Sequence, residues 1–325
     1  MISPSLPPDL RAALDKKLEG LARDDIAARA AQISKTYRDG GNSHAIASPV
    51  DALAYALVRM PATYAAVSAC LNALCEARPD FAPQRLLDVG AGPGTASWAA
   101  AETFASLQAF MLLDINAALQ TLALKLGKEN PRLATMTCRR DAHALDEVEA
   151  ADLVIASYLI GEVSEAERRA LAERLWSKTR DTLLVVEPGT PAGYARIIQL
   201  RAQLIASGAH VAAPCPHDRA CPLVPPDWCH FAQRLPRLRA HIQIKGAELP
   251  FEDEKFSYVV LTRGPATQRL SRVLAQPAIN KVEVSAKLCT ANGLGVAKVQ
   301  SRDKTAYAAA RRWRWGEAVE DVNRP

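Results

Sequence analysis

The sequence predicts an α/β protein with a parallel sheet, and two observations lead to that prediction. Between residues 85 and 207, short apolar runs alternate with longer stretches of helical spacing, which is typical of βαβ units. The first apolar run also ends in a glycine-rich turn that leads directly into a helical stretch. Because ligands of such sheets bind beyond the carboxyl ends of the strands, this turn marks a candidate site.

The N-terminal part is predicted to be helical. Residues 8–38 indicate two amphipathic helices, with Leu10 and Leu14 on one face of the first. After a loop rich in Gly, Ser and Asn, residues 51–77 indicate two more helices. We expect a break between these two at Pro61, because proline removes a helical hydrogen bond.

The remaining elements follow in order along the chain. Strands are predicted at residues 85–89, 108–114, 134–138, 151–157 and 182–187, with helices at 95–106, 116–128, 164–178 and 191–207. Residues 208–236 contain six prolines and three cysteines and are predicted to be irregular. Further strands are expected at 241–246, 256–264, 281–290 and 295–302, and a basic helix at 304–317. The predicted regions are a helical extension (1–80), the sheet domain (81–207), a cysteine-rich insertion (208–240), and a C-terminal part (241–325) that completes the sheet before a small β-rich unit and a basic tail.

The glycine-rich turn reads DVGAGPGT, from Asp88 to Thr95. Glycine lets a ligand approach the backbone closely at such a turn. Dinucleotide sites use the spacing GxGxxG, whereas this chain has GxGxG with an acid two residues before the first glycine. That pattern resembles the first motif of Rossmann-like, class I methyltransferases that use S-adenosylmethionine (SAM). The ammonium of SAM needs acceptors, and its carboxylate can use backbone N–H donors.

Further residues extend this resemblance. Asp114 ends the second predicted strand, where the methyltransferase pattern has an acid that accepts from the ribose hydroxyls. Hydrogen bonds of this charge-assisted type contribute about 1.5–3 kcal/mol each. The SAM-binding residues that the resemblance implies are Asp88, Gly90, Gly92, Gly94, Asp114, Asp141 near the adenine, and Ser157 at the methyl-transfer pocket. The alternatives are that the turn is kept for packing or binds another nucleotide.

The methyl acceptor is not defined by the sequence. After the strand at 151–157 the chain reads Ser-Tyr-Leu-Ile, which is not the Asn/Asp-Pro-Pro-aromatic motif of enzymes that methylate exocyclic amines of bases. No cysteine lies near residues 157–163, as the enzymes acting on carbon 5 of pyrimidines require. Glu187 follows the fifth strand and is a candidate carboxylate. A SAM-dependent methyltransferase is predicted, with its catalytic residue unassigned.

Cysteines gather in the proline-rich insertion. Three occur within 15 residues, with the spacing Cx5Cx7C, and a fourth follows in the C-terminal part. The candidate ligands are Cys215, Cys221, Cys229 and Cys289. Such thiolates suit an iron–sulfur cluster or zinc. The Cx2C spacing common in zinc sites is absent, but a Cys3His zinc site with His217 or His230, and unligated core cysteines, remain alternatives.

These motifs together resemble one family. The methyltransferase turn, CPHxxxCPL at 215–223, DWCHF at 227–231 and the later isolated cysteine are similar to those of methyltransferase-like assembly proteins of the small ribosomal subunit, first met in mitochondria and with bacterial members. The similarity runs from residues 59–67 to 312–317. It implies that the four cysteines hold a 4Fe-4S cluster, with zinc as the alternative. It also implies action on the small subunit or its rRNA, either as a methyltransferase or as a non-catalytic, rRNA-binding assembly factor that keeps the SAM fold. A methyltransferase of another substrate is the remaining alternative, although a small-molecule methyltransferase gives no reason for the basic tail.

The net charge of +5 is divided unevenly along the chain. Residues 1–200 carry 21 basic and 24 acidic side chains, whereas residues 201–325 carry 19 and 11. Clustered cations bind phosphate and aromatic side chains stack on unpaired bases, so we expect the basic C-terminal third to contact RNA. The predicted RNA-binding residues are Arg302, Lys304, Arg311, Arg312 and Arg314.

Composition and the N-terminal residues set the remaining expectations. With 49% hydrophobic and 23% charged residues, the chain is typical of a globular protein. No apolar run reaches the roughly 18–20 residues of a membrane span. The first residues have no apolar core like that of a signal peptide, and they contain acids, which transit peptides avoid. We therefore expect a cytoplasmic, bacterial-type protein that does not bind membranes, with a monomer as the simplest oligomeric state.

Overall fold

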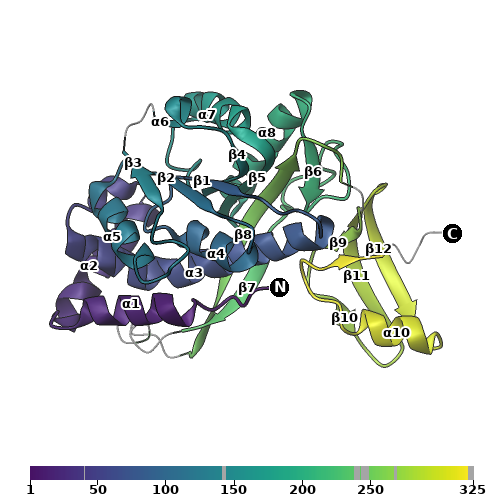
Figure 1. The fold of residues 1–325 in the computed structure, drawn as a ribbon. Helices are drawn as coiled ribbons and strands as arrows, with labels where there is room; N and C mark the ends of the chain where they lie inside the picture. Colours follow the sequence, from purple (N-terminus) through teal and green to yellow (C-terminus); the bar gives the residue numbers. More distant parts are fainter. Residues whose placement is uncertain (40, 141–143, 238–241, 243–248, 267–268, 321–325) are drawn as a thin grey trace.

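The computed structural model describes residues 1–39, 41–140, 144–237, 242, 249–266 and 269–320, and it confirms the α/β class (Figure 1). Its main sheet has the strand order β3-β2-β1-β4-β5-β8-β6, and β7 also pairs with β8. The strands are β1 (Arg85–Val89), β2 (Ala109–Leu113), β3 (Thr137–Arg139), β4 (Ala151–Ser157), β5 (Thr179–Pro188), β6 (His210–Ala213), β7 (Phe231–Pro236) and β8 (Phe251–Thr262). The strands β1 to β5 are parallel, and β8 runs antiparallel beside β5. This is the strand arrangement of the Rossmann-like class I methyltransferase fold that the sequence predicted.

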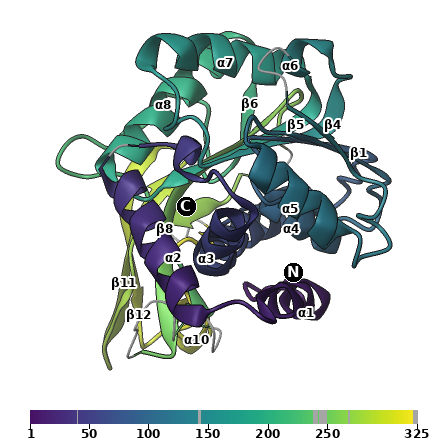
Figure 2. The ribbon, with the colours of Figure 1, turned by 90° about the vertical axis from the view of Figure 1, so that its left-hand side faces the viewer.

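Helices cover both faces of this sheet (Figure 2). One face carries α3 (Pro49–Ala77), α4 (Thr95–Thr103) and α5 (Ala117–Gly127), and the other carries α6 (Ala144–Glu147), α7 (Glu165–Ser177) and α8 (Pro191–Ala206). The centre of β4 and β5 is consequently buried on both sides, which explains why these strands read as continuous apolar runs. The sheet thus holds the carboxyl ends of β1, β2 and β4 at one edge, where the candidate site lies.

The predicted break at Pro61 is wrong. The segment forms one helix, α3, of 29 residues, with Pro61 buried inside it. Proline costs an interior helix about 3 kcal/mol, but α3 is buried along most of its length against α2, α4 and the sheet. Burial of this apolar surface outweighs the lost hydrogen bond, so packing keeps the helix continuous.

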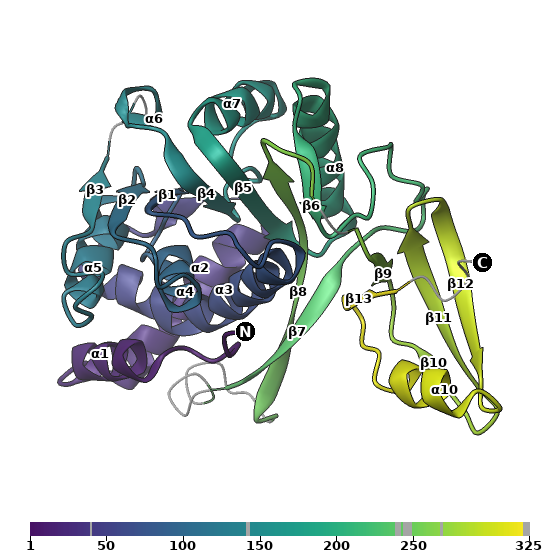
Figure 3. The ribbon, with the colours of Figure 1, turned by 45° about the vertical axis from the view of Figure 1, so that its right-hand side comes forward.

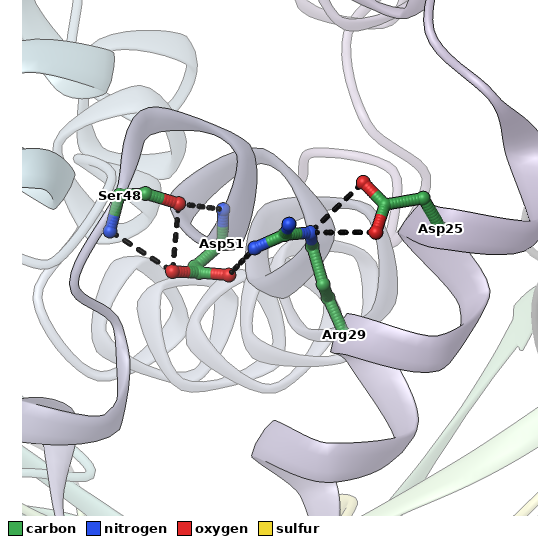
Figure 4. Close-up of polar contacts among 4 residues, drawn as sticks. All are labelled: Asp25, Arg29, Ser48 and Asp51. Carbon is green, nitrogen blue, oxygen red and sulfur yellow. Dashed lines mark hydrogen bonds and ion pairs between the residues drawn. The ribbon is translucent and has the colours of Figure 1, made fainter.

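The predicted pair of N-terminal helices is confirmed as α1 (Pro8–Leu18) and α2 (Arg23–Arg38). A polar network fastens α2 to the start of α3 (Figure 4). Arg29 binds Asp25, 2.9 Å away on its own helix, and Asp51 on α3, 2.7 Å away. Asp51 also forms a capping box with Ser48, so one arginine connects two helices through the cap that begins α3.

The insertion is more regular than predicted, since β6 and β7 lie within residues 208–236. They follow one another along the same edge of β8. Their pairing could not be read from residues rich in proline, because β8 supplies the hydrogen bonds from far along the chain. The irregular part is the connection between β6 and β7, which carries three of the candidate cysteines.

A second sheet forms the C-terminal part (Figure 3). It contains β9 (Ser271–Val273), β10 (Ala278–Ile279), β11 (Glu283–Thr290), β12 (Gly293–Gln300) and β13 (Ala318–Val319), with α10 (Lys304–Ala310) packed beside it. The helix predicted at 304–317 ends early, at Ala310. The strand predicted at 241–246 lies almost entirely outside the described residues. Within the described part of the chain, no helix is long and apolar enough to cross a membrane.

Candidate functional site

The glycine-rich turn joins β1 to α4 at the carboxyl edge of the main sheet. Gly90 and Gly92 have φ values of 69° and 53°, which residues with a Cβ rarely adopt. A Cβ on Gly90 would lie 2.7 Å from the Leu159 side chain, whereas one on Gly92 would meet no atom within 4 Å. Gly90 is therefore required for packing, and Gly92 leaves open space beside the backbone. Gly94, at the N-cap of α4, completes the turn.

Asp88 lies in β1 just before the turn, and its side chain is fully buried. Its Oδ2 accepts hydrogen bonds from the amide and the hydroxyl of Ser97, at 3.1 and 2.8 Å. Its Oδ1 has no hydrogen-bond partner among the described residues. Burial raises the pKa of Asp88 to about 7. A buried polar atom without a partner calls for an explanation, and a ligand that donates to Oδ1 would provide one.

Asp114 follows β2 directly and faces the same turn. Its Oδ2 accepts from the amide of Gly92 at 2.7 Å, and its Oδ1 accepts from the amide of Asn116 at 2.8 Å. Burial raises the pKa of Asp114. The predicted Asp88, Gly92 and Asp114 are thus brought together at one edge. The predicted Asp141 lies outside the described residues.

The loop before α3 folds over this edge. The side-chain amide of Asn116 donates to the carbonyl oxygens of Ser43 and Ile46, both at 2.8 Å. Glu162, which follows β4, accepts from the amide of Ser43 at 3.4 Å. Burial raises the pKa of Glu162 as well. A third carboxyl group, half-buried like Asp114, therefore lies near it.

These contacts leave a hollow between the loop and the start of α5. It is lined by residues of 43–47 and by residues 115–118, directly beside Asp114 in the chain. Sequence reasoning missed Ser43, Asn116 and Glu162. The loop has no periodicity that would show where it folds back, and Asn116 looks only like the helix cap that it also is.

The segment after β4 is tightly held. Ser157 ends β4, and Tyr158 follows in the left-handed region with φ 58°. The Tyr158 hydroxyl donates to Glu254 at 2.8 Å, while Leu159 packs on Gly90. A non-glycine residue in this conformation persists only when its surroundings hold it there. The segment expected to line a methyl-transfer pocket is therefore fixed by packing and partly fills the space next to the turn.

Glu187 lies inside β5 and is completely buried. It forms an ion pair with Arg196 at 2.7 Å and accepts from the amide of Gly161 at 3.3 Å. Burial raises the pKa of Glu187, and the charge of Arg196 opposes that rise. The carboxylate considered for catalysis is thus held by a guanidinium and a backbone amide.

The four candidate cysteines line one pocket where the two sheets meet. Cys215, Cys221 and Cys229 come from the β6–β7 connection, and Cys289 comes from β11. This connection reaches the C-terminal sheet (Figure 3), where Lys287 of β11 binds Asp227 at 2.6 Å. All seven cysteines of the chain are free thiols. The fold therefore gathers residues that are up to 74 positions apart, from Cys215 to Cys289.

Two arginines and a tyrosine line the pocket beside the cysteines. The Tyr194 hydroxyl donates to Cys221 Sγ at 3.2 Å, and the pocket is also lined by Arg201 of α8 and Arg272 of β9. Burial raises the pKa of the Cys229 and Cys289 thiols, and the neighbouring thiols raise it further. These thiols are therefore neutral without a metal, and metal binding would have to release their protons.

The two histidines considered as zinc ligands, His217 and His230, lie near the cysteine pocket. His217 Nε2 lies 3.8 Å from Cys289 Sγ, so His217 borders the pocket. His230 stacks on Trp228, with ring centres 4.9 Å apart. Among the described residues, no group of three or more His, Cys, Asp or Glu side chains is arranged to hold a metal ion. The four cysteines share a pocket.

The predicted RNA-binding side chains lie on the surface of the C-terminal part, around α10. Arg302, Lys304, Arg311, Arg312 and Arg314 are all exposed. The neighbouring tryptophans are turned inward, since Trp313 packs against the small cores of this part and Trp315 contacts the edge of His230, 4.8 Å between ring centres. The cations are therefore placed for a partner, whereas the tryptophans stabilise the fold.

Comparison with known proteins adds the family. A family model described as mitochondrial small ribosomal subunit Rsm22 matches residues 49–320. The chain belongs to the Rsm22 family. The human ribosome assembly protein METTL17, mitochondrial, is 31% identical over 290 residues, which cover 82% of this chain and 62% of the human protein. The Rsm22-cox11 tandem protein 2, mitochondrial, of Schizosaccharomyces pombe is 24% identical over 323 residues, covering 82% of this chain and 42% of that protein. This Rsm22-family chain therefore spans less than two thirds of the length of these relatives.

Solved methyltransferases resemble part of this Rsm22-family chain. Magnesium protoporphyrin IX methyltransferase from Synechocystis, with bound SAM, is 14% identical, covers 62% of this chain and 80% of its own, and has a TM-score of 0.41. Precorrin-6y C5,15-methyltransferase from Geobacter metallireducens is 15% identical, covers 59% of this chain and 84% of its own, and has a TM-score of 0.38. The strand order β3-β2-β1-β4-β5-β8-β6 by itself defines the fold of the main sheet.

The family also corrects one prediction. We predicted a cytoplasmic, bacterial-type protein from the first residues of the chain. That prediction is contradicted, because the family description and the human and fission-yeast relatives all carry the word mitochondrial. The composition of a short N-terminal segment does not determine the compartment of this family.

Proposed function

We propose that this Rsm22-family chain is a methyltransferase-fold assembly protein of the small ribosomal subunit, which binds SAM at the glycine-rich turn and a 4Fe-4S cluster in the cysteine pocket. The observation that carries the proposal is the convergence of Asp88, Gly92 and Asp114 at the carboxyl edge of the sheet. The family relationship supplies the ribosomal partner, since the human relative is named as a ribosome assembly protein.

The charge of the first site suits SAM. SAM carries a sulfonium and an ammonium, and buried carboxylates accept from or attract such cations. Asp88 Oδ1 is a free acceptor for an ammonium proton. The two oxygens of Asp114 each accept one backbone amide, and because a carboxylate has about four acceptor positions, ribose hydroxyls can be added. Open space at Gly92 allows the ligand to lie against the backbone.

The second site suits a cluster better than a single ion. Each thiolate of a four-iron cluster binds a different iron atom, so the sulfur atoms stand farther apart than around one zinc ion. Four cysteines that line one pocket supply the four thiolates that such a cluster takes. Cys215, Cys221, Cys229 and Cys289 would hold the group. When bound, it supplies iron–thiolate bonds that connect the β6–β7 connection to β11.

The exposed cations of the C-terminal part would meet the phosphates of rRNA. They lie on and around α10, which packs against β11 and β12 of the C-terminal sheet. The cysteine pocket lies between that sheet and the main sheet. In this arrangement the main-sheet domain binds SAM beside Asp88 and Asp114, and the exposed cations around α10 contact the ribosome.

Methyl transfer with turnover is the second candidate function. The intact turn with Asp88 and Asp114 favours it, while the packed Tyr158 and Leu159 favour binding alone. Comparing rRNA methylation in cells with and without the gene separates the two. Loss of one methyl group that wild type restores and Asp88→Ala does not would establish the enzyme. Unchanged rRNA methylation would establish the assembly factor.

The main proposal is tested by titrating SAM into the anaerobically purified chain. We expect binding by the wild type, and an increase in Kd on the order of tenfold to a hundredfold for Asp114→Asn, since a charge-assisted hydrogen bond contributes about 1.5–3 kcal/mol. The exposed Glu129→Gln is the matched control and should bind as wild type does. Equal binding by Asp114→Asn would refute the assignment of this site, and co-sedimentation with small subunits tests the partner.

A further inference from the structure

Two arginines are buried at the cysteine pocket without an acidic partner. Arg201 on α8 and Arg272 on β9 have exposed fractions of only 2% and 5%, and both line the pocket. Within the described ranges of the chain, neither forms an ion pair with a carboxylate. Other buried or half-buried arginines do, as Arg196 does with Glu187. A buried charge without a counter-charge is unfavourable, so this pair requires an explanation.

Backbone carbonyls satisfy these arginines only in part. Arg201 donates to the carbonyl of His217 at 2.7 Å, and its buried Nε has no partner among the described residues. Arg272 donates to the carbonyls of Pro214 and Gly316 at 3.1 and 2.8 Å. Carbonyl oxygens orient a guanidinium but do not neutralise it. The charges of both arginines act electrostatically on the thiols of Cys215 and Cys289, so both guanidinium groups lie close to the candidate ligands.

We infer that Arg201 and Arg272 are positioning residues that supply the counter-charge of the 4Fe-4S cluster, and that Tyr194 adds a hydrogen bond to one of its thiolates. This inference rests on the proposed function. A dipositive four-iron core with four thiolates carries a net charge of two minus, which two guanidinium groups neutralise. Net charge and hydrogen bonds to sulfur are among the factors that set the reduction potential of such clusters.

The direction of the effect follows from the charge. On reduction the cluster accepts one electron from dithionite, no bond forms or breaks, and the site becomes more negative by one. Nearby positive charges favour this reduced state. Arg201→Gln and Arg272→Gln should therefore each lower the equilibrium constant of the one-electron reduction by about tenfold. This corresponds to a reduction potential that is about 59 mV more negative. Tyr194→Phe should lower it in the same direction by less, because it removes a hydrogen bond and no charge.

The experiment is an anaerobic redox titration of the full chain with dithionite, followed by visible absorbance. Arg169→Gln, an exposed arginine of α7, is the control and should titrate as wild type does. Arg201→Lys should restore most of the potential, which a purely structural role would not predict. Potentials of Arg201→Gln and Arg272→Gln that equal the wild-type value, at unchanged iron and sulfide content, would overturn the inference.

Two further outcomes are decisive. If Arg201→Gln fails to hold the cluster, retention by Arg201→Lys supports the role of charge, and loss in both variants contradicts it. A wild-type chain that contains zinc and no sulfide would overturn the cluster itself, and the inference with it. Failure of the proposed function is thereby distinguished from failure of the inference alone.

Discussion

The two candidate sites gather buried charges of opposite sign. The turn between β1 and α4 collects carboxyl groups, with Asp88 fully buried and Asp114 and Glu162 half-buried. The cysteine pocket collects the guanidinium groups of Arg201 and Arg272 instead. Because buried charge is unfavourable unless it is compensated, each site indicates the charge of what it binds. A cationic ligand such as SAM suits the first, and an anionic thiolate cluster suits the second.

The two sites also differ in how the fold builds them. The first arises mainly at the carboxyl ends of the neighbouring parallel strands β1, β2 and β4. The second draws on α8, the β6–β7 connection, β9 and β11. It therefore joins two sheets, and it should depend more strongly on the bound group than the first site does.

The largest expected effect is at the cysteine pocket. Cys229→Ser should lose the brown colour, iron and sulfide of anaerobically purified protein, because one iron atom loses its thiolate. SAM affinity should stay close to that of wild type if the two sites are independent. Cys75→Ser, on the helix α3 outside the pocket, should keep the cluster. Retention of iron and sulfide by Cys229→Ser would contradict the assignment of the cysteine pocket as the site of an anionic cluster.

At the acidic site, the stability of the chain and its affinity for SAM should both depend on the ionisation of Asp88. The pKa of Asp88 in the fold, about 7, lies above its ordinary value of 3.8. The stability that neutral Asp88 contributes without ligand is therefore complete below about pH 4 and is lost as the pH rises through about 7. Cationic SAM favours ionised Asp88, so its affinity should rise over the same range.

Asp88→Asn should remove the part of both slopes that lies near pH 7, since the amide does not titrate, whereas Asp114 and Glu162, whose pKa values are also raised, contribute in both proteins. The measurements are calorimetric SAM titrations and urea unfolding of the ligand-free chain, each at several pH values between about 4 and 8, on either side of the pKa of about 7. A wild-type affinity for SAM that falls as pH rises, or identical pH profiles for wild type and Asp88→Asn, would show that Asp88 does not meet the cationic part of the ligand.

A third prediction concerns the basic surface. Replacing Arg311, Arg312 and Arg314 by Gln should weaken binding to a small-subunit rRNA fragment and reduce the slope of log K against log salt by about 2, since each phosphate contact contributes about 0.7 for single strands. Arg169→Gln on α7, in the half of the chain with net negative charge, should leave the slope unchanged. Equal slopes in the triple variant and the wild type would place the RNA contact elsewhere.

The smallest effect is expected at the cap of α3. Ser48→Ala removes the cap of α3, and loss of such a cap costs about 1 kcal/mol in the free energy of unfolding. Urea unfolding measures this change, while cluster content and SAM affinity should remain as in wild type. A variant that loses the cluster would show that the N-terminal helices support the cysteine pocket directly.

Sequence patterns predicted the parts of the fold that depend on local periodicity. The strands β1, β2, β4 and β5, the turn, and Asp114 were all found, because alternating apolar runs and a glycine-rich turn are local signals. Contacts between distant residues were not predictable. The pairing of β6 and β7 with β8, the continuity of α3 through Pro61, and the approach of Arg201 and Arg272 to the cysteines depend on packing that no local pattern encodes.

The site shows the same division. Spacing singled out four cysteines as candidate ligands, and the fold places them in one pocket. It could not show that two arginines, which have no carboxylate partner among the described residues, line the same pocket, or that Leu159 packs against the turn. Asn116 and Ser43 meet only because α3 and its preceding loop fold back over β2. Residues that act through long-range contacts therefore carry no sequence signal of their own, although they determine the charge of each site.

The most direct test of two oppositely charged sites is the metal and sulfide content of the wild-type chain after anaerobic purification. We predict a brown protein that contains iron and acid-labile sulfide in equal amounts, and little zinc. A colourless protein with one zinc ion per chain and no sulfide would contradict the account.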